Sequence, residues 1–140
     1  MYKKILVPVD GSEGGWKALT AAKEVAEAGK SELVVMTVVQ VFAGASIMPI
    51  PVESGKINEE LGNIANDILA QAKEKVGGVK AEFVAAPGRP SKVIVDTAKK
   101  SGADLVVIGS RGLSGLAEFF LGSVSSEVAQ LSPVSVLIVK

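Results

Sequence analysis

The stretch ILVPVDGSEGGWKALTAAKEVAEAGKSELVVMTVV, residues 5–39, holds two apolar runs on either side of a segment with helical periodicity. The runs, Ile5 to Val9 and Leu33 to Val39, are typical of strands that are covered on both faces. Between them, apolar residues recur every three or four positions from Trp16 to Ala26, which predicts an amphipathic helix that Gly29 ends. Two buried strands joined by a helix predict a right-handed crossover between parallel strands.

The same alternation continues along the rest of the chain. The predicted helices cover residues 57–76, 90–100 and 123–131, and the predicted strands cover residues 79–86, 104–108 and 134–139. The complete order, β-α-β-α-β-α-β-α-β, predicts an α/β fold with a parallel sheet and helices on both faces. We expect a single domain that spans residues 1–140.

Two segments lack the periodicity of a helix or a strand. Phe42 to Gly55 contains Pro49 and Pro51 and predicts a loop of unusual length, whose role the sequence leaves open. Gly109 to Gly122 predicts a second loop, with a short helical stretch from Leu116 to Leu121.

Composition removes several kinds of chemistry. The chain has no cysteine and no histidine, which excludes disulfides, thiolate or imidazole metal sites and a Ser-His-Asp triad. Its 15 basic and 15 acidic residues balance, so we expect neither a nucleic-acid partner nor a membrane partner. The apolar runs are too short for a signal peptide or a membrane span, and we expect a cytoplasmic protein.

Unusual residues follow the first and fourth predicted strands. The first strand runs into PVDGS, residues 8–12, and the fourth into GSRG, residues 109–112. In open α/β sheets, ligands bind beyond the carboxyl ends of the strands, where the strand order reverses. If these two strands are neighbours, the two segments face one crevice.

The start of the last predicted helix is suited to a phosphate group. Gly122 precedes it and Ser123 begins it, so the Ser123 hydroxyl and the N–H groups of Val124 and Ser125 are unpaired donors near the positive end of the helix dipole. Glycines let the backbone approach a ligand closely, and successive N–H groups bind anions. Arg111 adds a positive charge.

A nucleotide would use two further residues. The carboxylate of Asp10 is an acceptor for ribose hydroxyls or an adenine amino group, and Val38 is placed to line an apolar slot for the base.

Structural roles explain the same residues about as well. Asp10 with Glu13 fits a helix-capping box, Gly109 and Gly112 fit turn glycines, and Ser123 fits an N-cap. Taken from the residues alone, nucleotide binding and structural capping both remain open.

Three segments resemble the universal stress protein A family, and together the resemblance covers essentially the whole chain. KILVPVDGS, residues 4–12, is similar to the opening strand and turn of that family. The pattern Gly109-x2-Gly112-x9-Gly122-Ser123 is similar to the motif of its ATP-binding branch, and residues 132–140 are similar to its last strand.

The resemblance implies a Rossmann-like fold of the adenine nucleotide α hydrolase type, with a five-stranded sheet in the order 3-2-1-4-5. It implies bound ATP, or ADP or AMP, with Mg or Mn held by the phosphates and with no protein metal ligand. The implied contacts are Pro8, Val9, Asp10 and Val38 around the adenosine, Gly109, Ser110, Arg111 and Gly112 around ribose and phosphates, and Gly122, Ser123, Val124 and Ser125 on the phosphates.

The resemblance also implies a regulatory or stress-response role and a homodimer through the apolar strand Val134 to Val139. Thr37 stands where many relatives carry histidine, and Arg111 stands where some relatives carry it. These differences bear on hydrolysis more than on binding. Two alternatives are a slow ATPase or phosphoryl-transfer enzyme and a dimeric interaction module without nucleotide. We assign no catalytic residue.

Overall fold

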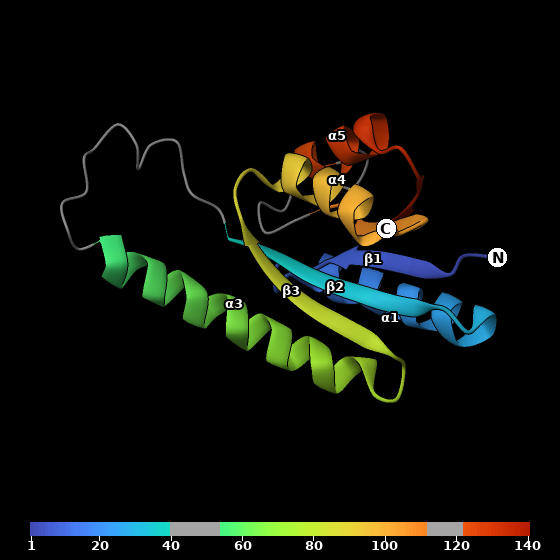
Figure 1. Ribbon diagram of the computed structural model, residues 1–140, viewed down its shortest axis with the longest axis horizontal. Coiled ribbons are helices and arrows are strands. Elements are labelled where there is room, and N and C mark those ends of the chain that lie inside the picture. Colours follow the sequence, from blue (N-terminus) through green and yellow to red (C-terminus); the bar gives the residue numbers. More distant parts are fainter. Residues whose placement is uncertain (40–53, 112–121) are drawn as a thin grey trace.

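The computed structural model describes residues 1–39, 54–111 and 122–140 (Figure 1). Within the helix at residues 54–76 it describes side chains from residue 62 onward. The elements are β1 (Lys4–Pro8), α1 (Glu13–Gly29), β2 (Glu32–Val39), α3 (Ser54–Val76), β3 (Ala81–Pro87), α4 (Pro90–Ser101), β4 (Leu105–Gly109), α5 (Ser123–Leu131) and β5 (Ser135–Val139). Their order confirms the predicted alternation of strands and helices.

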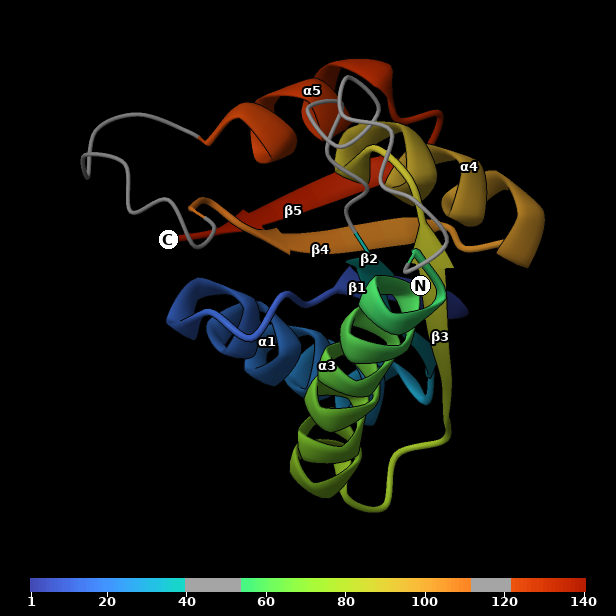
Figure 2. The same cartoon turned by 90° about the vertical axis from the view of Figure 1, so that its left-hand side faces the viewer.

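The sheet has five strands in the order β3-β2-β1-β4-β5, and each neighbouring pair is parallel. Helices α1 and α3 cover one face and α4 and α5 cover the other (Figures 1 and 2). The expected order and the helices on both faces are therefore confirmed. The central strands β1 and β4 lie side by side, with Ile5 opposite Leu105.

The apolar core has two layers because successive strand residues point to opposite faces. On β1, Ile5 and Val7 pack under α1 and α3, whereas Leu6 packs under α4 and α5. On β4, Val107 packs under α1 and α3, whereas Val106 packs under α4 and α5. Burial on both faces is the physical reason why these strands are continuous apolar runs in the sequence.

Several boundaries differ from the prediction. Gly29 is still helical, and Lys30 takes the left-handed conformation (φ 53°) that ends α1. Ser54 and Gly55, predicted as loop, belong to α3, and the rest of the predicted loop at residues 42–55 lies outside the described residues. The short helix predicted at residues 116–121 also lies outside them. Within the described ranges, every helix is too short or too polar to cross a bilayer.

Asp104 ties the amino ends of two strands together. It was predicted as the first residue of a strand, but it precedes β4, and its carboxylate accepts hydrogen bonds from the backbone N–H groups of Lys3 (2.9 Å) and Lys4 (3.1 Å). Burial raises the pKa of Asp104, but these backbone hydrogen bonds outweigh it and bring the pKa below its ordinary value. This contact holds β1 against β4 at the edge of the sheet farthest from residues 109–111.

We expect Asp104→Asn to lower the free energy of unfolding by about 1 kcal/mol at neutral pH, because a charge-assisted acceptor is lost at a partly exposed position. A carboxyl whose pKa is lowered by folding stabilises the protein above its unfolded pKa, and this stabilisation is lost as the pH falls through the folded value. The difference from wild type should therefore shrink in urea unfolding experiments as the pH falls through the lowered pKa of Asp104. Asp67→Asn, at an exposed site on α3, is the control. An equal loss in both variants would contradict the assignment.

Candidate functional site

The carboxyl ends of β1 and β4 meet at one edge of the sheet, as the sequence predicted for neighbouring strands. The first turn of α1 lies directly against the end of β4. A Cβ atom added to Gly109 would lie 2.7 Å from the carbonyl oxygen of Gly14, and one added to Gly14 would lie 2.6 Å from the carbonyl oxygen of Arg111. Gly109 lies within a strand and does not form a turn, so its missing side chain serves this close backbone contact.

The turn that follows β1 is held by Asp10 and Ser12. Ser12 is the N-cap of α1, because its hydroxyl accepts a hydrogen bond from the Gly15 N–H (3.2 Å). The Oδ1 atom of Asp10 accepts from the N–H (3.0 Å) and the hydroxyl of Ser12. The capping box between Asp10 and Glu13 is therefore wrong. Asp10 is exposed, and no described residue donates to its Oδ2 atom.

The start of α5 is fixed by the carbonyl group of Ser110. Gly122, the N-cap, donates its N–H to the Ser110 oxygen (2.7 Å). The buried hydroxyl of Ser125 lies within hydrogen-bonding distance of the same oxygen (3.1 Å) and of the Gly122 oxygen (3.0 Å). Ser123 is the first helical residue, so its interpretation as the N-cap is wrong. The glycine cap offers no side chain to the helix.

Three backbone donors at the start of α5 consequently have no acceptor among the described residues. The first N–H that bonds within the helix is that of Ser126, which donates to Gly122 (3.0 Å). The N–H groups of Ser123, Val124 and Ser125 precede it, at the positive end of the helix dipole. Ser123 is exposed, whereas Ser125 offers only its N–H because its hydroxyl is engaged. This arrangement is suited to a phosphate group.

The structure places the other predicted residues as follows. Val9 is buried beneath α1 and donates its N–H to the Met36 oxygen (2.8 Å). Pro8 and Val38 are partly exposed at the ends of their strands. Gly112 lies outside the described residues.

An ionic cluster between α4 and α5 was not predicted. Glu127 on α5 accepts a hydrogen bond from the buried Ser91 hydroxyl (2.6 Å) and two from the Arg89 guanidinium (3.0 and 3.1 Å). The Ser91 hydrogen bond and the Arg89 charge lower the pKa of Glu127, against the effect of desolvation. The cluster fixes α5 on α4 and so helps to position the amides at its start. Residues 36 to 38 positions apart give no sequence signal for such a contact.

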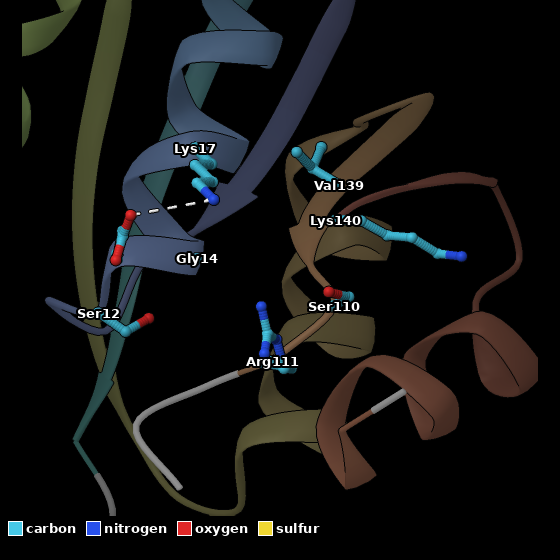
Figure 3. Close-up of a pocket in the computed structure, with 8 residues that line it drawn as sticks. Ser12, Gly14, Lys17, Ser110, Arg111, Val139 and Lys140 are labelled. Atoms are coloured by element: carbon cyan, nitrogen blue, oxygen red, sulfur yellow. Dashed lines mark ion pairs between the residues drawn. The ribbon is translucent and has the colours of Figure 1, made fainter. Parts of the chain in front are cut away.

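A small cavity of about 210 Å³ lies on the α1 side of the same edge, between the first turn of α1 and the ends of β4 and β5 (Figure 3). It is lined by Ser12, Glu13, Gly14, Lys17, Ser110, Arg111, Val139 and Lys140. Of the residues predicted to bind nucleotide, the cavity contains Ser110 and Arg111. Ser12 belongs to the segment, residues 8–12, that was predicted to face the crevice, and the remaining lining residues were not predicted as part of a site.

Comparison with known protein families matches residues 1–140 to the universal stress protein family. The chain belongs to this family. Among its relatives, universal stress protein YxiE of Bacillus subtilis is 41% identical over 148 aligned residues, which cover 100% of both chains.

Solved structures of universal stress proteins share the fold. Universal stress protein UspA from Lactobacillus plantarum superposes with a TM-score of 0.86 at 27% identity, covering 99% of this chain and 98% of that one. A universal stress protein in complex with cAMP superposes with a TM-score of 0.74 at 31% identity, covering 99% and 97%.

The contact between α1 and β4 predicts the effect of a glycine substitution on β4, and an open glycine on α3 provides the control. Gly109→Ala should lower the free energy of unfolding by about 1–3 kcal/mol, because its Cβ would overlap the backbone of Gly14. Gly62→Ala, on α3 with no atom within 4 Å of the added Cβ, should instead raise it by about 0.5–1 kcal/mol. Thermal and urea unfolding measure both effects. A neutral Gly109→Ala would contradict the contact.

Proposed function

We propose that this protein binds an adenine nucleotide, with ATP as the foremost candidate, at the carboxyl edge of its sheet. The observation that carries the proposal is the set of three N–H groups, of Ser123, Val124 and Ser125, that have no acceptor among the described residues. A phosphate chain supplies the acceptors and the negative charge that these groups favour.

A comparison with α1 argues that the start of α5 serves a ligand. In α1 the Ser12 side chain caps the helix and accepts a hydrogen bond from one first-turn N–H, that of Gly15. In α5 the N-cap is glycine, and the nearby Ser125 hydroxyl is directed to two carbonyl oxygens instead. The first turn of α5 therefore keeps its donors available.

The rest of the edge fits a nucleoside. The Oδ2 atom of exposed Asp10 is an acceptor for ribose hydroxyls, and Pro8 and Val38 offer apolar surface at the ends of adjacent strands. The backbone of residues 109–111 leads from the sheet toward the α5 amides, because the Ser110 oxygen binds Gly122. The cAMP complex of a relative that is 31% identical supports this ligand class.

A divalent ion such as Mg²⁺ or Mn²⁺ would be held by the phosphate oxygens, because the donors at the start of α5 are N–H groups and do not bind cations. We propose a regulatory or stress-response role in the cytoplasm and assign no catalytic residue.

Ser123→Pro tests the amides directly. Proline is favoured at the first helical position, and the extended backbone of Gly122 (ψ 157°) tolerates a following proline, so the helix should be retained. The variant removes one donor to a charged group, worth about 1.5–3 kcal/mol, so the Kd for ATP should rise about 10- to 100-fold in titration calorimetry.

Two further variants at this position make the test specific. Ser123→Ala keeps the N–H and should bind ATP nearly as well as wild type. Ser123→Glu places a negative charge at the helix start, which should stabilise the fold by about 0.3–1 kcal/mol and yet weaken ATP binding by repulsion. Equal affinity for ATP in wild type and in the proline and glutamate variants would overturn the proposal.

We further propose that the protein forms a homodimer through β5. The strand lies at the end of the sheet, pairs with β4 on one side, and carries Leu137 with 41% of its surface exposed. An apolar strand with unpaired backbone groups favours pairing with a second copy.

Leu137→Lys should therefore convert dimer to monomer, because the charge would lie within the paired edge. Sedimentation equilibrium measures the mass. Ile64→Lys is the matched control, since Ile64 is 56% exposed but lies on α3, at the opposite side of the sheet. A wild-type protein that stays monomeric at high concentration would contradict the dimer.

A further inference from the structure

The cavity beside the first turn of α1 has the features of an anion site, and it is distinct from the amides of α5. The Ser110 oxygen, on the main chain, faces the start of α5, whereas the Ser110 side chain lines the cavity (Figure 3). The end of β4 therefore separates the two places.

The side chain of Ser110 is the strongest sign of a ligand. The residue is 8% exposed, and no described residue is a hydrogen-bond partner of its hydroxyl group. Every fully enclosed polar side-chain atom in the described parts of the chain has a partner. The Ser110 hydroxyl must therefore reach open space, and the cavity that it lines is that space. A buried hydroxyl of this kind favours a polar occupant.

Backbone donors face the same cavity. Ser12 caps the Gly15 N–H of α1, but the N–H groups of Glu13 and Gly14 have no acceptor among the described residues. Both residues line the cavity, and α1 is 17 residues long, so its positive dipole end is fully developed. These donors are suited to oxyanion oxygens.

The charged side chains around the cavity also favour an anion. Lys17 and Arg111 direct basic side chains toward the cavity, whereas the ammonium group of Lys140 points away from it (Figure 3). Glu13 contributes one acidic side chain. The Glu13 side chain is 88% exposed and lies 3.9 Å from the Lys17 ammonium group. An exposed pair at this distance is weak, so Lys17 can turn to an anion at little cost.

Size selects the class of ligand. About 210 Å³ is below the range of about 300–1,000 Å³ that is typical of pockets for larger ligands. This volume matches a tetrahedral oxyanion better than a whole nucleotide. We infer that this cavity binds a small tetrahedral oxyanion, with inorganic phosphate as its representative, independently of the nucleotide site.

Amide NMR signals locate the binding directly. Titration of the ¹⁵N-labelled protein with inorganic phosphate at low salt should shift the signals of Glu13 and Gly14. Lys17→Gln should weaken this response about three- to fivefold, because one partly exposed charge is lost. Lys23→Gln should leave it unchanged; Lys23 forms the equivalent pair with Glu27 on the same helix, also at 3.9 Å. Ser110→Ala, which retains the backbone bonds of residue 110, should also weaken the response.

Two arms separate free phosphate from the phosphates of a bound nucleotide. The phosphate titration is repeated with ATP in saturating amounts, and the Glu13 and Gly14 response should persist with the same midpoint. Abolition by ATP would show that the cavity belongs to the nucleotide site and would overturn the inference. Fixed Glu13 and Gly14 signals without ATP, or an unchanged response in Lys17→Gln, would overturn it as well. The arm without ATP is informative even if the protein binds no nucleotide.

Discussion

The close backbone contact between Gly14 and Gly109 is the constraint on which the geometry of this edge depends. It brings the first turn of α1 within van der Waals distance of the end of β4. The next residue, Ser110, then receives the start of α5 through its carbonyl oxygen. Two helix starts thus converge on one short segment of chain, from opposite faces of the sheet. Any side chain at Gly109 would push the first turn of α1 away from the end of β4.

This convergence concentrates positive potential without using many charged residues. The dipole of each helix contributes a partial positive charge at its first turn, and the N–H groups that lack an acceptor point outward from it. Because most of these donors belong to the backbone, the proposed binding depends on where the helices begin more than on which side chains they carry. The Arg89–Ser91–Glu127 cluster matters for the same reason, since it fixes α5 on α4.

Much of this architecture could be predicted from the sequence, because burial on both faces leaves continuous apolar runs such as residues 33–39 and helices leave periodic ones. The strand order followed from the family resemblance. The finer features could not be predicted in the same way. Asp10 and Ser12 are both good N-caps, and only the folded turn decides between them. Whether Gly109 serves a turn or a close contact depends on α1, which is distant in sequence from β4. The cavity joins three elements and has no local pattern.

The hydrogen bonds of Asp104 lie at the other end of the same strands. They clamp β1 to β4 where the strands begin, whereas the proposed recognition groups lie where the strands end. Anchoring and recognition are therefore spatially divided along a strand only five residues long. Substitutions at the carboxyl ends of the strands can therefore change ligand preference while the Asp104 hydrogen bonds keep β1 and β4 aligned. This separation makes the fold tolerant of evolutionary and engineered change at its binding edge.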